Sequence, residues 1–169
     1  MSNLLTTIQR TDGINIHGKT VQRTAVRAVI QRGCHLLMVH SANVGDYKFP
    51  GGGVDAGESH AQALRREVRE ECGAKLTYIG EEIGTVVEYD FDTETDCDTF
   101  KMTSHYYRCE VTDGFGVQKL DGYEKDLGFT PTWISIEAAL RQNKLLLDSE
   151  NAPEWLKREI FVLEYLRNS

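Results

Sequence analysis

The order of apolar and polar positions predicts strands in the N-terminal part of the chain. β-Branched and apolar residues dominate residues 24–30 and 35–39, on either side of a break at residues 31–33, so we predict two paired strands there. Two longer segments of strand-like composition follow at residues 76–91 and 100–111. The polar stretch that connects them suits a hairpin, and these segments together predict one sheet.

Residues 59–72 are the clearest predicted helix. Ser59 and Gln62 have the spacing of a capping box, and Gly73 follows at the position where glycine commonly ends a helix. One apolar stripe runs along the predicted helix: Ala61, Leu64, Val68 and Cys72. We therefore expect an amphipathic helix that packs one side against the sheet.

The C-terminal part of the chain is predicted to be mostly helical. A short strand at residues 133–135 precedes a small helix at residues 136–142, and a final amphipathic helix starts near Pro153. Its residues expected to face inward are Trp155, Leu156, Ile160, Leu163 and Leu166. Strands with helices between and after them predict an α/β fold in which helices cover both faces of a mixed sheet.

The first residues and the chain length bear on domain organisation. An apolar run from Ile14 to Val21 turns at residues 17–19, so we expect an edge hairpin within residues 1–22. A chain of 169 residues fits one domain, and we expect residues 1–169 to form it. A homodimer through the N-terminal hairpin stays an open alternative.

Composition excludes several classes of protein. The formal net charge of −7 repels a nucleic-acid backbone, so we do not expect a polymer of nucleotides as partner. No segment approaches the roughly 18 consecutive apolar residues of a membrane span. The cysteines lie apart and have no metal-ligand spacing: Cys34, Cys72, Cys97 and Cys109. Free thiols of this kind indicate a reducing compartment, and we expect a cytoplasmic protein that acts on a small molecule.

The segment Phe49–Gly53 interrupts the predicted strands with one proline and three glycines. Backbone without side chains can approach a ligand closely, so Gly51, Gly52 and Gly53 are candidate substrate-binding residues. Lys48 precedes this loop and is a candidate phosphate contact. Phe49 either lines the pocket wall or packs into the core.

Three glutamates in the predicted helix are spaced for metal binding. Glu67, Glu70 and Glu71 stand at positions i, i+3 and i+4, so we expect their carboxylates on one face. Their mutual repulsion destabilises a helix unless a cation binds them. Oxygen ligands favour Mg²⁺, with Mn²⁺ as a substitute.

The glycine loop and these glutamates belong to one longer pattern. It reads Gly52-x5-Glu58-x7-Arg66-Glu67-Val68-x-Glu70-Glu71-x-Gly73-Ala74. This pattern resembles the signature of the Nudix hydrolases, the MutT-like enzymes, and departs from it only at Ala74, where the family usually has a bulkier aliphatic residue. The resemblance implies a Nudix-type α/β/α sandwich and Mg²⁺-dependent cleavage of the diphosphate linkage in a nucleoside diphosphate derivative.

The resemblance also implies roles for single residues. The metal ligands would be Glu67, Glu70 and Glu71, with the Gly52 carbonyl as a further ligand and one glutamate acting on the attacking water. Arg66 would pair with Glu58 or Glu67 and hold the loop against the helix. Nucleoside triphosphates, dinucleoside polyphosphates, ADP-ribose and nucleotide sugars all contain the required linkage. Further acids downstream are open as extra ligands or as the base: Glu110, Asp113, Asp121, Glu124 and Asp126.

Two other functions stay open on the sequence. A catalytically silent Nudix-like sensor would bind a nucleotide without cleaving it. A calcium-binding protein would use the alternating acids of residues 88–98, but counting from Asp90 the positions that need glycine and glutamate hold Thr95 and Lys101. A solvated hairpin tip is the better interpretation of that segment.

Overall fold

The computed structural model describes residues 2–169. The strands are β1 (Leu4–Gln9), β2 (Thr20–Arg32), β3 (His35–Ser41), β4 (Tyr47–Lys48), β5 (Gly51–Gly53), β6 (Leu76–Phe91), β7 (Thr99–Val111) and β8 (Phe129–Ser135). The helices are α1 (His60–Cys72), α2 (Gly122–Leu127), α3 (Ile136–Leu146) and α4 (Leu156–Arg167). No helix within residues 2–169 combines the length and apolarity needed to cross a membrane.

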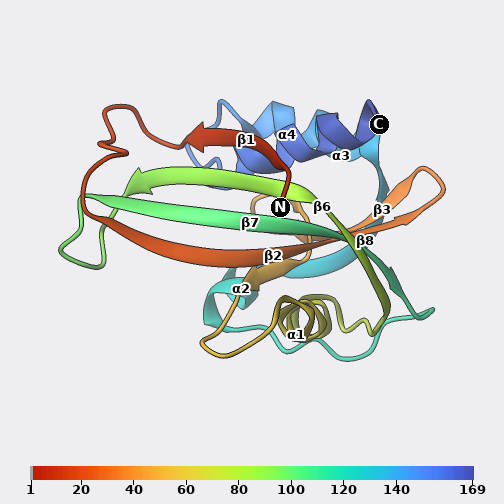
Figure 1. The fold of residues 1–169 in the computed structure, drawn as a ribbon. Helices are drawn as coiled ribbons and strands as arrows, with labels where there is room; N and C mark the ends of the chain where they lie inside the picture. The colour runs from red at the N-terminus through yellow and green to blue at the C-terminus, as the bar shows by residue number, and fades with distance from the viewer. Residues whose placement is uncertain (1) are drawn as a thin grey trace.

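The strands form one mixed sheet between two helical layers. Its order is β1-β6-β7-β2-β3-β4, with β5 on β2 and β8 on β3. The pairs β1–β6 and β2–β7 are parallel, and the others are antiparallel. In Figure 1, α1 and α2 lie on one side of the sheet and α3 and α4 on the other. The predicted α/β sandwich is therefore confirmed.

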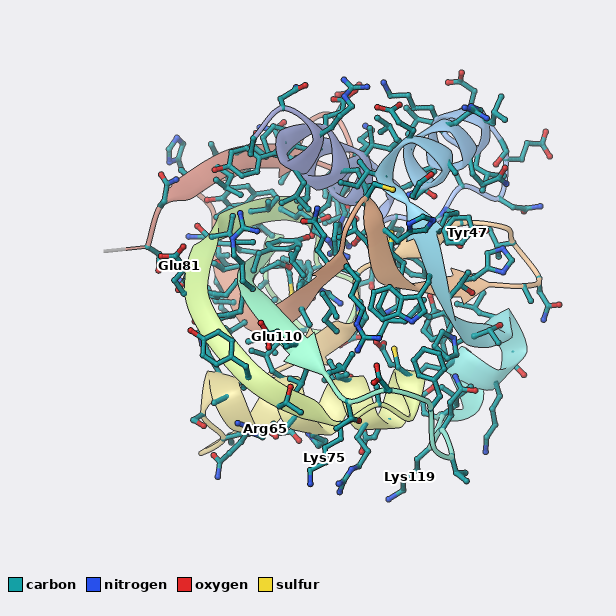
Figure 2. All side chains as sticks on the ribbon, turned by 90° about the vertical axis from the view of Figure 1, so that its right-hand side faces the viewer. Tyr47, Arg65, Lys75, Glu81, Glu110 and Lys119 are labelled. Carbon is teal, nitrogen blue, oxygen red and sulfur yellow. The ribbon has the colours of Figure 1, made fainter. Side chains whose placement is uncertain are left out.

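Two apolar cores fill the spaces between the layers, as the packed side chains in Figure 2 show. Successive residues of a strand point to opposite faces, and β2 therefore contributes to both cores. Val26 and Ala28 pack with Leu64 and other residues of the α1 side. Val29 packs instead with Leu163 and other residues of the α4 side.

The predicted pairing of residues 24–30 with 35–39 holds only at the turn. β2 and β3 pair at Gln31–Leu36 and Arg32–His35 and then diverge. β2 continues beside β7, whereas β3 continues beside β8. The divergence makes room for the segment 47–53, whose ends pair with β3 as β4 and with β2 as β5. The sheet itself thus positions the glycine loop.

The predicted N-terminal hairpin at residues 14–21 is wrong. Thr20 and Val21 begin β2, and the residues before them form a turn that bonds to the tip of the β6–β7 hairpin: the Lys19 amide donates to Asp98, and the Thr99 hydroxyl donates to the Asn15 carbonyl. The edge strand is β1, parallel to β6. The turn finds its hydrogen-bond partners on the β6–β7 hairpin instead of on a second short strand.

Several element boundaries also differ from the expectation. β8 begins at Phe129, α3 extends to Leu146, and α4 begins at Leu156 instead of near Pro153. In α1 the predicted stripe residue Ala61 is exposed, and Ala63 is buried beside Leu64 in its place. The β6–β7 hairpin is confirmed, since the two strands pair in antiparallel register along residues 76–91 and 99–111.

Candidate metal centre

Both ends of α1 are fixed by the residues expected to cap it. The Ser59 hydroxyl accepts the Gln62 amide at 3.2 Å, and the Gln62 side chain accepts the Ser59 amide at 2.8 Å. Gly73 has φ = 65°, and its amide donates to the Arg69 carbonyl at 2.9 Å. A Cβ at Gly73 would collide with the Gly116 carbonyl, so glycine is required there. These caps fix where the helix presents its glutamates.

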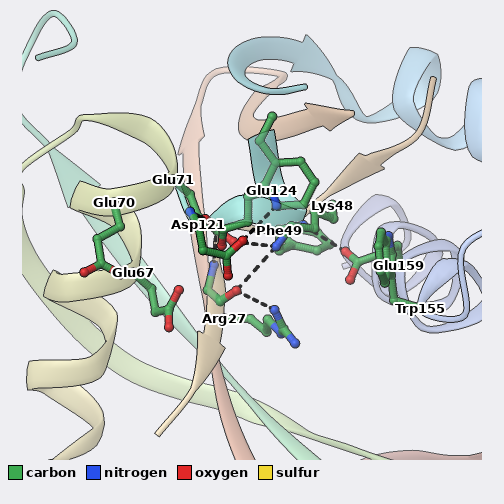
Figure 3. A network of polar contacts seen from close by, with 12 residues as sticks. Arg27, Lys48, Phe49, Glu67, Glu70, Glu71, Asp121, Glu124, Trp155 and Glu159 are labelled. Carbon is green, nitrogen blue, oxygen red and sulfur yellow. Dashed lines mark hydrogen bonds and ion pairs between the residues drawn. The ribbon is translucent and has the colours of Figure 1, made fainter. Parts of the chain in front are cut away.

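The three glutamates of α1 lie on one side of the helix, within about 100° of one another, but the Glu70 carboxylate does not join the other two. Glu67 and Glu71 are 8% and 1% exposed, whereas the Glu70 side chain is 31% exposed and lies 3.5 Å from Arg66. Figure 3 shows Glu70 pointing away from Lys48 and Glu124. Consecutive residues of a helix are about 100° apart, so Glu70 diverges from Glu71 although both flank Glu67.

Glu71 is held in place by the segment that precedes the glycine loop. Its carboxylate accepts the Lys48 ammonium at 2.6 Å and the Gly51 amide at 2.8 Å. Lys48 is 6% exposed, and its ammonium also lies 3.4 Å from the Gly51 carbonyl. Lys48 is therefore a counter-ion of Glu71, and it also lines the cavity beside these carboxylates, so its predicted phosphate contact stays a prediction.

The glycines bring backbone close to α1. Gly51 has φ = 143°, and a Cβ there would collide with the Val26 carbonyl. A Cβ at Gly52 would lie 2.6 Å from a Glu67 carboxylate oxygen. The sequence predicted no regular structure for this segment, but Gly51–Gly53 pairs with β2 as β5. Glycine allows this pairing because a larger residue would not fit between β2 and α1.

Arg66 pairs with Glu58 and Glu67 and holds the loop, as predicted. Its Nε and Nη2 each lie 2.9 Å from a Glu58 oxygen, and Nη1 lies 2.6 Å from Glu67. Nη2 also donates to the Gly53 carbonyl at 2.9 Å. These bonds lower the pKa of Glu58 to about 2 and raise that of Arg66. Arg66 thus links the loop residues Gly53 and Glu58 to Glu67 on α1.

A third carboxylate reaches Glu67 and Glu71 from a distant part of the chain. Glu67, Glu71 and Glu124 each place an oxygen within 4.8 Å of the other two. Glu124 lies on α2, where its side chain accepts the Asp121 amide at 2.9 Å in a capping box. Glu124 is one of the five downstream acids that the sequence left as candidate ligands or base. The capping-box spacing of Asp121 and Glu124 is the sequence signal for this short helix.

The three carboxylates of Glu67, Glu71 and Glu124, here called the acidic cluster, fit a divalent cation. Burial and the neighbouring Glu71 raise the pKa of Glu67. Burial, with a smaller contribution from Glu71, also raises the pKa of Glu124. Like charges held this close need a cation or a proton, and oxygen donors from two elements suit Mg²⁺ or Mn²⁺.

The sequence of the chain matches one known domain family. The model of the NUDIX domain matches residues 21–157, which include the acidic cluster, the glycine loop and all of β2 except its first residue. The chain belongs to the Nudix family. The match begins after β1.

Individual relatives of this Nudix chain fall into two groups. The nucleoside triphosphatase NudI of Salmonella heidelberg (strain SL476) is 50% identical over 60 residues, which cover 32% of this chain and 43% of NudI. The chain thus matches less than half the length of this relative. A NUDIX hydrolase from Nitrosomonas europaea has a TM-score of 0.59 at 20% identity, covering 88% of this chain and 90% of that one. The MutT protein from Methanosarcina mazei Go1 has a TM-score of 0.56 at 18% identity, covering 89% and 98%. These two structures share the fold.

A cavity of about 310 Å³ opens beside the acidic cluster in this Nudix fold. Three arginines also line this cavity: Arg10, Arg27 and Arg158. The Arg27 Nη1 donates to the Gly51 carbonyl at 2.6 Å, and its buried Nε has no partner within residues 2–169. Burial, followed by the charge of Arg158, lowers the pKa of Arg27. A substrate phosphate would relieve both the unpaired donor and the repulsion.

Phe49 does not line this cavity, which corrects one of the two open interpretations. Its side chain is fully buried and meets the Tyr106 ring edge-on at a centroid distance of 5.7 Å. Its amide donates to Glu159 of α4 at 2.9 Å. The alternation of a strand sends Phe49 into the core on the α4 side, so the aromatic ring supports the loop from behind.

Proposed function

We propose that this Nudix protein hydrolyses a phosphoanhydride bond of a nucleoside triphosphate with Mg²⁺ bound at Glu67, Glu71 and Glu124. The observation that carries the proposal is the convergence of these three carboxylates on one cavity that Arg27 also lines. The name of the relative NudI, a nucleoside triphosphatase, supports a triphosphate over the other candidate diphosphate compounds.

The ligand set of the proposal extends beyond the acidic cluster. The Gly52 backbone lies directly against Glu67, which supports the Gly52 carbonyl as a further ligand. Glu70 would exchange its 3.5 Å contact with Arg66 for the metal. That exchange costs little, because an ion pair that is partly exposed contributes at most about 1 kcal/mol. Bound Mg²⁺ would neutralise phosphate charge and lower the pKa of a coordinated water. Mn²⁺ would substitute because it prefers similar oxygen ligands.

The residues of the cavity also position the substrate. Arg27 would hold the phosphates in line for attack, because its guanidinium still has an unpaired donor within residues 2–169. Water attacks phosphorus, the bridging P–O bond breaks, and its electron pair leaves with the departing phosphate or nucleotide. The proton of the water passes to a carboxylate of the acidic cluster.

The test is hydrolysis of a panel of nucleoside triphosphates, dinucleoside polyphosphates, ADP-ribose and nucleotide sugars with Mg²⁺, with Mn²⁺ and with chelator. We expect cleavage of at least one triphosphate, no cleavage in chelator, and a loss of about 100-fold or more in Glu124→Gln. Glu110→Gln is the matched control, since Glu110 is exposed on β7 and outside the cavity.

Two outcomes would contradict the proposal. Activity that survives chelation would exclude the metal at the acidic cluster. Calorimetric binding of a triphosphate without any cleavage would favour the nucleotide sensor instead. Cleavage of another compound in the panel, with the same dependence on metal and on Glu124, would keep the centre and replace the substrate.

A further inference from the structure

Two histidines lie close together where the start of α1 meets the sheet. His60 is the first residue of α1, and His105 lies in the middle of β7. The centroids of their rings are 4.5 Å apart, and the ring planes are inclined by 57°. Neither residue lines the cavity beside the acidic cluster, so the pair has no part in the reaction proposed above.

A carboxylate and a phenol hold the two rings in place. Glu82 on β6 stands opposite Tyr107 on β7, and the Tyr107 hydroxyl donates to one Glu82 oxygen at 3.1 Å. The other Glu82 oxygen lies 3.1 Å from the His105 Nδ1. The His60 Nδ1 lies 2.8 Å from the Tyr107 hydroxyl. Glu82 therefore orients His105 directly and His60 through Tyr107.

These bonds determine which nitrogen of each neutral ring carries the proton. Burial alone would raise the pKa of Glu82, but hydrogen bonds from Ser2, His105 and Tyr107 together lower it, so the carboxylate is ionised and the His105 Nδ1 must donate to it. Burial raises the pKa of Tyr107 to about 12, so its hydroxyl keeps its proton. That proton goes to Glu82, and the hydroxyl oxygen accepts from the His60 Nδ1. Both neutral rings therefore have the Nδ1–H tautomer, with a lone pair on Nε2.

The Nε2 atoms of His60 and His105 are open to solvent. Neither has a hydrogen-bond partner within residues 2–169, and neither is among the buried atoms that lack one. Both Nδ1 atoms point toward Glu82, directly or through Tyr107, so both Nε2 atoms point away from it. Burial, followed by the charge of His105, lowers the pKa of His60, which favours the neutral ring and its free lone pair.

Imidazole rings held in this way are suited to bind a transition metal. A histidine that ligates a metal generally donates its other ring N–H to a carboxylate or another fixed acceptor, as His60 and His105 do here. A metal about 2.1 Å from each Nε2 would lie about 3.2 Å from each ring centroid. Centroids 4.5 Å apart then correspond to an N–metal–N angle of about 90°. This is the angle between neighbouring ligands of tetragonal Ni²⁺ or Cu²⁺, two ions that imidazole suits.

The histidine pair differs from the acidic cluster in the number and the kind of its ligands. Within residues 2–169, the acidic cluster is the one place where three carboxylate, imidazole or thiol side chains converge. The acids of residues 88–98 therefore give the calcium alternative no support. His60 and His105 supply two ligands, and water would fill the remaining positions. Because their ligands are nitrogen instead of oxygen, the pair selects a different class of metal from Mg²⁺.

We propose that His60 and His105 bind a divalent transition metal ion of the Ni²⁺ or Cu²⁺ type through their Nε2 atoms, with Glu82 and Tyr107 orienting the rings. The bound ion would connect the first residue of α1 to β7 and thereby fix the start of the helix that carries Glu67 and the other two glutamates. The site shares no residue with the acidic cluster, so it does not depend on the proposed hydrolysis.

The test is a titration of the whole protein with Ni²⁺, followed by NMR of the histidine side chains, with Mg²⁺ in excess to occupy oxygen ligands. The chain has five histidines, so each ring can be assigned from a single variant. Before Ni²⁺ is added, His60 and His105 should both show the Nδ1–H tautomer. Paramagnetic Ni²⁺ should then broaden the ring signals of these two before those of His17, His35 and His40.

Calorimetry on variants measures the contribution of each residue. Glu82→Gln removes the carboxylate that orients the rings, and loss of such a partner should lower the affinity for Ni²⁺ about 10- to 100-fold. His105→Asn removes a ligand and should lower the affinity further. His35→Asn is the matched control, because His35 is exposed and lies 3.4 Å from the Cys34 thiol, the pair that would compete for the ion.

Three results would overturn the site. One is broadening of His35 or His40 before His60 and His105. Another is equal affinity for Ni²⁺ in the wild type and in His105→Asn. The third is calorimetric binding of Ni²⁺ that leaves every histidine signal sharp, which would place the ion at the acidic cluster alone. None of these measurements requires turnover, so a failure of the proposed hydrolysis would leave the histidine site to be decided on its own.

Discussion

Two buried groups of charged residues lie on either side of the segment 49–51, and they differ in charge balance. The acidic cluster of Glu67, Glu71 and Glu124 lies toward α1 and α2. The group here called the arginine cluster lies toward α4 and consists of Arg10, Glu88, Arg158 and Glu159. The segment bonds to both groups of charged residues (Figure 3): the Phe49 amide donates to Glu159, and the Gly51 amide donates to Glu71.

The arginine cluster is balanced. Arg158 lies 2.7 Å from both Glu88 and Glu159, and Arg10 lies 3.1 Å from the other Glu88 oxygen. Burial alone would raise the pKa of Glu88, but Arg158 and Arg10 outweigh it and the pKa is lowered. Two carboxylates thus meet two guanidinium groups, and nothing further is needed to neutralise them.

The acidic cluster is not balanced. Within residues 2–169, Lys48 contacts only Glu71 among its carboxylates, and Arg66 divides its donors among Glu58, Glu67 and Glu70. Burial leaves the pKa of Glu67 raised in spite of its contact with Arg66. Buried charge that the protein leaves unpaired indicates a ligand, whereas buried charge that it pairs completely indicates scaffold. This difference supports the proposal that α1 carries the chemistry, with α4 as its support.

The largest effect should follow from breaking the balanced cluster. Arg158→Met would leave Glu88 and Glu159 buried without their partner, and losing one member of a buried ion pair costs about 3–5 kcal/mol. Urea denaturation measures the change in the free energy of unfolding. Arg167→Met is the control on the same helix, where the exposed Arg167 lies 4.0 Å from Glu137 and should contribute less than about 0.5 kcal/mol. Equal stability of the two variants would remove the distinction between the clusters.

The next effect should separate chemistry from folding at neighbouring glycines. Gly52→Ala directs its methyl group at the Glu67 carboxylate, the movable end of a side chain, so stability should change little. Displacing that carboxylate by about 1 Å should lower kcat/KM on the order of 100-fold. Gly51→Ala meets the Val26 backbone carbonyl instead, at a backbone conformation that only glycine readily adopts, so it should destabilise the fold. Circular dichroism and steady-state kinetics on both variants provide the comparison, and normal activity in Gly52→Ala would contradict the contact.

The local part of the site could be predicted from the sequence. Ser59, Gln62 and Gly73 predict the limits of α1 through capping chemistry, which depends only on neighbouring residues. The pairing of Arg66 with Glu58 could also be predicted, because the two residues are only eight positions apart. Glu58 lies in the loop just before α1, and Arg66 lies about two turns into the helix. The strands of the β6–β7 hairpin were also predictable, because a polar connection separates two apolar segments.

The rest depends on contacts between distant residues, which spacing does not determine. Glu124 joins Glu71 from 53 positions away, and only the fold brings α2 over the cavity. The contact of Lys48 with Glu71 was not predicted, because nothing local indicated it. β1 pairs with a strand that begins 67 residues after its end, and its six residues carried too little pattern to identify it.

The smallest effect should be a difference in pH dependence between two glutamates that share Arg66. Glu58 has a pKa of about 2, below its unfolded value of 4.5, so its contribution to stability is present above pH 4.5 and is lost as pH falls toward 2. Glu67 has a raised pKa, so its contribution is present below pH 4.5 and is lost as pH rises through the folded pKa. In chelator, Glu58→Gln should therefore be less stable than the wild type at pH 7 and approach it on acidification. Glu67→Gln should gain on the wild type as pH rises. Urea denaturation at several pH values measures both differences. Parallel curves for the two variants would mean that Arg66 compensates Glu67 as fully as Glu58, and the acidic cluster would then need no cation.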